Sequence, residues 1–168
     1  MISLLSGLFG SNSFALKPGD TLPEIKAMNQ DGKEVNLKAL RGKPILVYFY
    51  PKDDTPGCTK EACLLRDYYD QFAKAGAVIL GVSRQDAQSH QKFRKKHNLP
   101  FDLLVDEDGQ VAKAMGIELY PVVGLHKRES ILIDREGKIF KNYKDVSPEA
   151  HASEVLKDIK EMDTKGSH

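Results

Sequence analysis

The chain has 168 residues, of which 40% are hydrophobic and 29% are charged. This length suits one globular domain, and the composition excludes a collagen-like or intrinsically disordered chain. Lysine and arginine total 25 against 24 aspartates and glutamates, a formal charge of +1, so neither nucleic acid nor a membrane is an expected partner. Two cysteines are too few for a disulfide scaffold, so we expect them to take part in chemistry. The same low count favours a cytoplasmic location over a periplasmic one.

Residues 1–16 form an apolar N-terminal extension without a charged side chain. We interpret it as a segment that docks on its own domain or on a partner. The alternatives are a targeting segment, which normally begins with a basic region, and a membrane-surface helix, which normally has Lys or Arg on its polar face. Both alternatives stay open. Residues 17–162 are the predicted domain, and residues 163–168 are a C-terminal tail that resembles a cloning remnant.

The first half of the domain reads as a βαβ unit preceded by a hairpin. In chain order we expect a hairpin at residues 25–37, a strand at 44–50, a loop at 51–57, a helix at 59–75 and a second strand at 77–83. The hairpin turns at Asp31-Gly32, and Gly76 ends the helix. Both strands are unbroken apolar runs, which is typical of parallel strands buried on both faces.

The second half adds two helices, a strand, a hairpin and a closing helix. In chain order we expect a helix at residues 86–97, a strand at 101–105, a short helix at 110–115, a hairpin at 130–143 and the closing helix at 148–162. Ser147 is a predicted N-cap with Pro148 at the first helical position. The order of elements predicts one three-layer α/β domain with a central mixed sheet flanked by helices.

Cys58 is the residue most suited to chemistry, because it follows a buried strand and begins a helix. Sites in open α/β sheets form at the carboxyl ends of strands. The first turn of a helix has unpaired N–H groups and a partial positive charge, which favour a thiolate. An unperturbed thiol is only ~3% thiolate at pH 7, so a reactive cysteine needs such help. The alternative is a small apolar residue that fills the space between helix and sheet.

The loop before Cys58 supplies a polar group in a rigid setting. Thr55 lies three residues before Cys58, and across the turn its hydroxyl can reach the sulfur or a bound substrate oxygen. Pro51 and Pro56 restrict the backbone, as a preformed site requires.

Cys63 lies five residues after Cys58 in the same predicted helix. An intact helix would hold their Cα atoms about 8.6 Å apart, whereas a disulfide needs less than about 7 Å. A Cys58–Cys63 bond would therefore require the first turns of the helix to unwind. The alternative is that the second cysteine is coincidental.

The pattern Pro51-x-x-x-Thr55-x-x-Cys58 resembles the active-site signature of the peroxiredoxins. The longer run from Tyr50 to Cys63 resembles their Q-type branch, also called bacterioferritin comigratory protein. The order of elements over residues 17–162 resembles the thioredoxin-like fold of that family.

The resemblance implies a thiol peroxidase that reduces hydrogen peroxide and organic hydroperoxides in antioxidant defence, without a metal or organic cofactor. Cys58 would be the peroxidatic cysteine and Cys63 the resolving cysteine. Thr55 would hydrogen-bond the peroxide and Pro51 would shield the sulfur from water. Arg128 would stabilise the thiolate and the charge that develops on the peroxide oxygens; without the resemblance it would count as an ordinary surface arginine.

The resemblance also implies a partner: thioredoxin or glutaredoxin would regenerate the enzyme. A monomer is expected, and a dimer through the N-terminal extension stays open. A disulfide oxidoreductase and a copper carrier on the same fold are alternatives. The first normally needs a CxxC pair, which is absent, and the second needs closely paired cysteines with a well-placed histidine.

Overall fold

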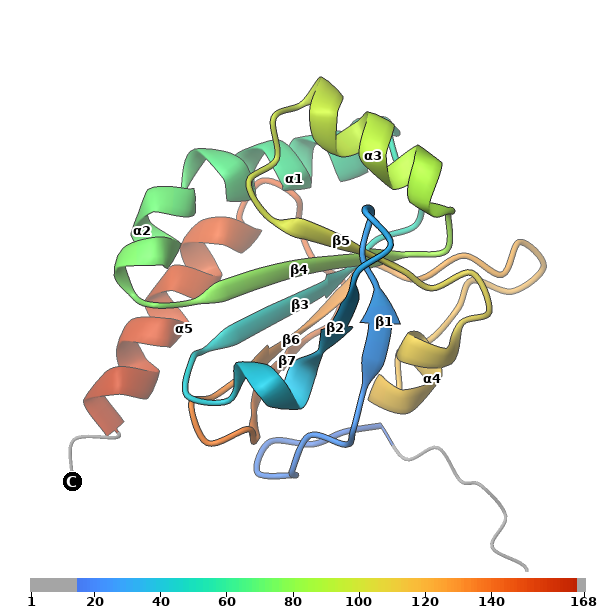
Figure 1. The fold of residues 1–168 in the computed structure, drawn as a ribbon. Coiled ribbons are helices and arrows are strands. Elements are labelled where there is room, and N and C mark those ends of the chain that lie inside the picture. The colour runs from blue at the N-terminus through green and yellow to red at the C-terminus, as the bar shows by residue number, and fades with distance from the viewer. Residues whose placement is uncertain (1–14, 166–168) are drawn as a thin grey trace, which may run out of the picture.

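A five-stranded mixed sheet forms the centre of the computed structural model, which describes residues 15–165. Its strand order is β5-β4-β3-β6-β7. These strands are β3 (Ile45–Phe49), β4 (Val78–Ser83), β5 (Asp102–Val105), β6 (Glu129–Ile133) and β7 (Ile139–Tyr143). β3, β4 and β5 run parallel, while β6 is antiparallel to both β3 and β7. Figure 1 shows this sheet between two layers, so the predicted three-layer α/β architecture is confirmed.

Four helices cover one face of the sheet and share one hydrophobic core with it. They are α1 (Pro56–Asp67), α2 (Tyr69–Lys74), α3 (Ala87–Lys96) and α5 (His151–Lys165). Alternate residues of β3 point into this core, which contains Leu46 and Tyr48, and into the opposite core, which contains Val47 and Phe49. This two-sided burial explains the unbroken apolar run in the sequence.

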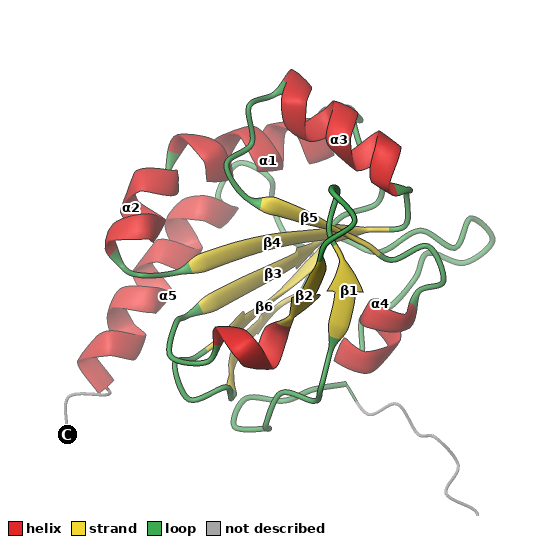
Figure 2. Cartoon of the chain, in the orientation of Figure 1, coloured by secondary structure: helices red, strands yellow, loops and turns green. Residues whose placement is uncertain are grey.

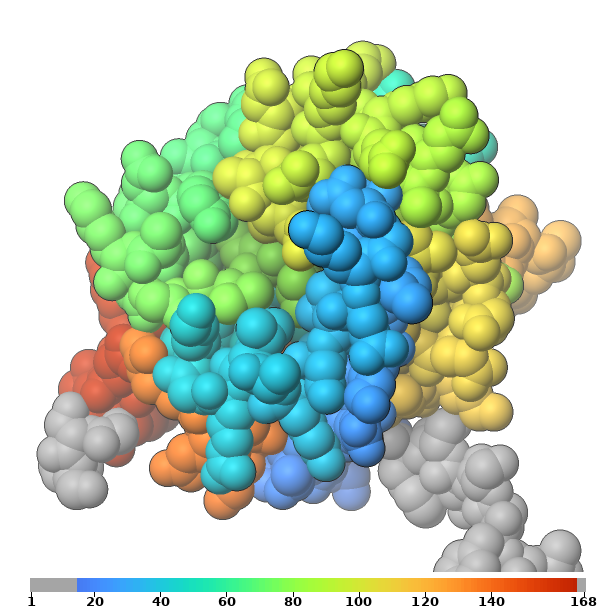
Figure 3. Space-filling view, in the orientation of Figure 1, coloured from blue at the N-terminus to red at the C-terminus, as the bar shows by residue number. Residues whose placement is uncertain are grey.

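The opposite face is covered by smaller elements (Figure 2). They are the hairpin of β1 (Lys26–Met28) and β2 (Glu34–Asn36), a 3₁₀ helix (Leu37–Leu40) and α4 (Gln110–Met115). The space-filling view shows the hairpin and the segment after it lying over this face (Figure 3). The predicted hairpin and the short helix closed by Gly116 are confirmed; Gly116 has φ 70.

Two predicted helices have boundaries that differ from the structure. The helix expected over 59–75 begins three residues earlier, with Pro56 at a position where a missing N–H is tolerated, and is interrupted at Tyr68. Tyr68 has φ −91 and ψ 2, so the backbone leaves the helical geometry before α2 begins. The closing helix begins at His151 and not at Pro148; residues 148–150 form a turn in which the Ala150 and His151 N–H groups donate to the Ser147 carbonyl.

The ends of the chain are described only in part. Leu16 packs against the opposite core, which contains Val47 and Phe49, and its carbonyl accepts a 2.6 Å bond from Asn142 Nδ2. Residues 1–14 of the predicted extension lie outside the described residues, so the docking prediction stays a prediction. Residues 163–165, predicted as tail, belong to α5, and residues 166–168 lie outside the description. Within residues 15–165, no helix has the length and apolar character needed to span a membrane.

Candidate active site

The sheet topology brings Cys58 and Arg128 together from distant parts of the sequence. Cys58 lies in the first turn of α1, which follows the carboxyl end of β3. β6 runs antiparallel to β3 and pairs Glu129 with Phe49, so the chain enters β6 where β3 ends. Arg128 immediately precedes β6 and therefore lies beside the start of α1.

Arg128 connects the sulfur to a buried carboxyl group. Its Nη2 donates to Cys58 Sγ at 3.3 Å, and its Nη1 donates to Glu61 Oε1 at 3.3 Å. The approach is close to the backbone of α1 as well: a Cβ atom added to Gly57 would lie 3.0 Å from Arg128 Nη2. Glycine at this position leaves room for the guanidinium.

Cys58 and Glu61 are both enclosed by protein, with 2% and 1% of their surface exposed. Burial raises the pKa of Glu61 to about 7, although the Arg128 charge works in the opposite direction. Glu61 Oε2 has no hydrogen-bond partner among residues 15–165. Sequence reasoning missed Glu61; the available signal was its spacing of three residues from Cys58, which places both on one face of a helix.

Thr55 occupies the N-cap position of α1, and its carbonyl accepts a 2.8 Å bond from the Thr59 N–H. Its hydroxyl donates to the Lys52 carbonyl at 2.8 Å. A hydroxyl has one donor and two acceptor sites, so the Thr55 oxygen can still accept a bond from a bound substrate. Pro51 is partly buried at the start of the same loop.

Cys63 is partly buried and free, and it lies in the continuous helix α1 with Cys58. Their five-residue separation places the side chains on different faces of the helix. The structure therefore joins Cys58 and Arg128, places Thr55 and Pro51 in the loop before them, and leaves Cys63 apart. Both cysteines lie in one helix, as expected, so a Cys58–Cys63 disulfide would still require that helix to unwind.

His151 lies behind the site and was not singled out in the sequence. Its Nε2 lies 2.8 Å from Ser130 Oγ. Its ring packs edge-on against the Tyr143 ring, with the two ring centroids 5.1 Å apart. Burial, together with the Arg128 charge, lowers the pKa of His151 to about 4. His151 is therefore neutral at physiological pH and adds no second positive charge near Arg128.

Comparisons with known proteins identify relatives of this chain. The family model described as "AhpC/TSA family" matches residues 18–141. The chain is 42% identical to a chloroplastic peroxiredoxin Q of Oryza sativa subsp. japonica over 145 residues, 86% of this chain and 67% of that protein. It is 41% identical to peroxiredoxin Bcp of Bacillus subtilis over 152 residues, 88% of this chain and 97% of that protein.

Solved structures show the same relationship. Peroxidoxin BcpB of Mycobacterium tuberculosis matches with a TM-score of 0.81 and 32% identity, over 88% of this chain and 98% of that one. A cysteine-to-serine mutant of PrxQ from Xylella fastidiosa matches with a TM-score of 0.80 and 30% identity, over 87% of this chain and 96% of that one.

The chain belongs to the AhpC/TSA family, whose members have a thioredoxin-like fold. Within it, the chain is similar to the Q-type peroxiredoxins, and its function is that of a thiol peroxidase. The resemblance stated from residues 50–63 is confirmed.

Proposed function

We propose that Cys58 is the peroxidatic cysteine and that its thiolate attacks the terminal oxygen of a hydroperoxide. The S–O bond forms as the O–O bond breaks, so the sulfur becomes a sulfenic acid and the other oxygen leaves as an alkoxide or hydroxide. That leaving group takes a proton from solvent. The contact between Arg128 Nη2 and Cys58 Sγ is the observation that carries this assignment.

Arg128 and Thr55 have complementary roles in this proposal. The guanidinium donates to the sulfur before the reaction and stabilises the negative charge that moves onto the peroxide oxygens during it. The Thr55 oxygen, whose own hydrogen is directed to the Lys52 carbonyl, accepts the O–H of the peroxide. Pro51 limits the access of water to the sulfur.

The second step is resolution by Cys63. Its thiolate attacks the sulfenic sulfur, the hydroxyl group leaves as water after taking a proton, and a Cys58–Cys63 disulfide forms. We propose that thioredoxin or glutaredoxin reduces this disulfide by thiol exchange. We further propose a monomer that acts in the cytoplasm, where such dithiol proteins are kept reduced.

The test is a coupled assay with hydrogen peroxide, thioredoxin, thioredoxin reductase and NADPH. Cys58→Ser is expected to abolish turnover, whereas Cys63→Ser is expected to reduce one equivalent of peroxide and then stop. After one equivalent of peroxide, the mass of the wild-type chain should fall by two hydrogens. Full turnover by Cys58→Ser would refute the assignment, and a disulfide-linked dimer would refute the pairing within one chain.

A further inference from the structure

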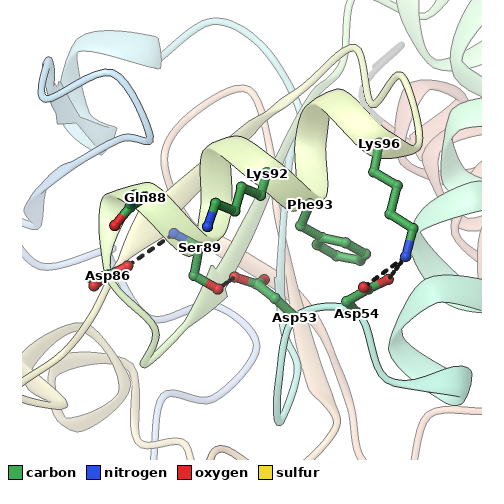
Figure 4. A pocket seen from close by; sticks show the side chains of 8 residues that line it. All are labelled: Asp53, Asp54, Asp86, Gln88, Ser89, Lys92, Phe93 and Lys96. Carbon is green, nitrogen blue, oxygen red and sulfur yellow. Dashed lines mark hydrogen bonds and ion pairs between the residues drawn. The ribbon is translucent and has the colours of Figure 1, made fainter.

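Asp53, two residues before Thr55 in the loop between β3 and α1, contacts three other side chains. Its Oδ1 accepts a 2.6 Å bond from the Tyr50 hydroxyl. Its Oδ2 lies 2.6 Å from His90 Nδ1 and accepts a 2.8 Å bond from Ser89 Oγ. Only 4% of the Asp53 side chain is exposed. Figure 4 shows Ser89 on α3 directed at Asp53, which comes from the facing loop.

The partners of His90 define its role in this cluster. Its Nε2 faces the Leu104 carbonyl at 2.9 Å, and its Nδ1 faces the Asp53 carboxylate. The ring is therefore held at both nitrogens, by the loop on one side and by the end of β5 on the other. A buried cluster with several hydrogen bonds favours one geometry strongly, because moving either side chain would leave buried polar atoms without partners.

The backbone of the loop is held by the same neighbouring segment. The Asp53 N–H donates to Gln85 Oε1 at 3.1 Å. The Pro51 carbonyl accepts 3.4 Å bonds from Gln85 Nε2 and Ser83 Oγ. Residues 83–90, which lead from the end of β4 into α3, thus hold both the main chain and the side chain of the loop.

This anchor is mechanically connected to the reactive site. Thr55 lies two residues after Asp53, and its hydroxyl bonds the Lys52 carbonyl, on the residue just before Asp53. Its carbonyl accepts the first main-chain bond of α1, from Thr59. A shift of Asp53 would therefore move the Thr55 hydroxyl and the first turn of the helix that carries Cys58.

We propose that Asp53 is a positioning residue for the peroxidase reaction: through Tyr50, Ser89 and His90 it fixes the loop that presents Thr55 and Pro51 to the Cys58 sulfur. This inference rests on the proposed role of Cys58. Asp53 acts through the geometry of the loop and not through its own charge. A misplacement of about 1 Å can lower a reaction rate by about 100-fold, so such an anchor has a measurable effect.

The test compares two reactions of one sulfur in full-length protein with Cys63→Ser, where Cys58 is the only thiol. Stopped-flow measurements give the rate constants for hydrogen peroxide and for iodoacetamide. Alkylation needs an ionised and accessible sulfur, whereas the peroxide reaction also needs the surrounding loop. We expect Asp53→Ala to lower the ratio of peroxide to iodoacetamide rate constants by at least about tenfold.

The conservative variant separates position from charge. Asp53→Asn keeps the shape, and its amide has both an acceptor for the Tyr50 hydroxyl and a donor for His90 Nδ1, so the ratio should stay within about threefold of the parent. The matched control is Asp54→Asn, in an exposed ion pair with Lys96 at 2.8 Å, and it should leave the ratio unchanged. Asn tolerates the left-handed backbone of Asp54, which has φ 58.

Each outcome decides the proposal. An unchanged ratio in Asp53→Ala would overturn it, and so would an equal loss in Asp53→Asn, which would assign the effect to charge. If Asp53→Ala does not fold, Tyr50→Phe and Ser89→Ala each remove one donor, and an unchanged ratio in both would overturn it. If the parent sulfur shows no preference for peroxide over iodoacetamide, the assignment of Cys58 fails independently of Asp53.

Discussion

Arg128 is shared between Glu61 and Cys58, with one guanidinium nitrogen 3.3 Å from the carboxyl oxygen and the other 3.3 Å from the sulfur. Both neighbours are acids, and both are almost fully buried. When Glu61 is protonated, the Arg128 charge acts on the sulfur alone; when Glu61 is ionised, the two acids share it. The protonation of Glu61 therefore affects both the stability of the site and its reactivity.

Arg128→Met should lower the rate constant of Cys58 with hydrogen peroxide by about 100-fold to 1,000-fold. The substitution keeps an unbranched apolar chain but removes the donor that faces developing negative charge, a type of loss with this usual size. Stopped-flow measurement of the fluorescence or absorbance change on oxidation would give the rate constant.

The control for this variant is Lys127→Met, which removes a neighbouring positive charge in an exposed ion pair with Glu118. Exposed pairs contribute little, so its rate constant should stay close to that of the wild type. An equal loss in Lys127→Met would assign the effect to the general field of the protein and not to the contact with the sulfur.

Glu61→Gln should change how stability depends on pH. The pKa of Glu61 is raised from 4.5 to about 7, so between these values the folded state binds more protons than the unfolded state. The contribution of Glu61 to the free energy of unfolding is thus fully present below pH 4.5 and is lost as pH rises through 7. The loss is about 3 kcal/mol. Denaturant unfolding at pH 4.5 and 7.5 should show Glu61→Gln gaining stability relative to wild type by this order.

His151 has the opposite effect on the same measurement and provides its control. Its pKa is lowered from 6.5 to about 4, so its contribution to stability is present above pH 6.5 and is lost as pH falls toward 4. In the wild type the two effects partly cancel. His151→Gln should therefore lose stability relative to wild type as pH rises, and a parallel shift in both variants would contradict the assignment.

Local patterns were sufficient to predict the fold because each element has its own signal. The apolar runs at β3 and β4, the hairpin turns and Gly116 all agree with the structure. The interruption at Tyr68 carried no such signal, because the Leu65, Tyr68, Tyr69 and Phe72 stripe has ordinary helical spacing on both sides of it. Helix boundaries depend on main-chain bonds that residue types determine only weakly.

The site was predictable to different depths. Cys58 has a positional signal at a strand end, but Arg128 was identified only by resemblance, since its contact depends on the antiparallel pairing of β6 with β3. Glu61 and Asp53 were missed as functional residues because charged residues are almost never fully buried unless paired. Their roles follow from partners that are distant in sequence, Arg128 and His90.

Oxidation should remove the hydrogen-exchange protection of the first turns of α1. The intact helix holds Cys58 and Cys63 too far apart for a disulfide, so its main-chain bonds must break before the sulfurs meet. The Thr59 amide, which bonds the Thr55 carbonyl at 2.8 Å, should exchange faster in oxidised protein. The Glu154 N–H in α5, which donates to the Ala150 carbonyl at 3.1 Å, serves as the internal reference. Retained protection of Thr59 in disulfide-bonded protein would contradict the mechanism.

Gly57→Ala should separate stability from reactivity. The backbone of Gly57 is not in the left-handed region, and alanine is more favourable than glycine in a helix by about 1 kcal/mol, so the midpoint of thermal unfolding should be unchanged or higher. The new methyl group would lie 3.0 Å from Arg128 Nη2, which is too close for an undisturbed contact. Because Glu61 holds the other guanidinium nitrogen, the displacement should fall on the bond to Cys58 and lower the peroxide rate constant by several-fold, about 1 kcal/mol in activation free energy. A variant that is more stable and equally fast would show that the guanidinium moves without affecting the sulfur, and that the 3.3 Å contact does not control the reaction.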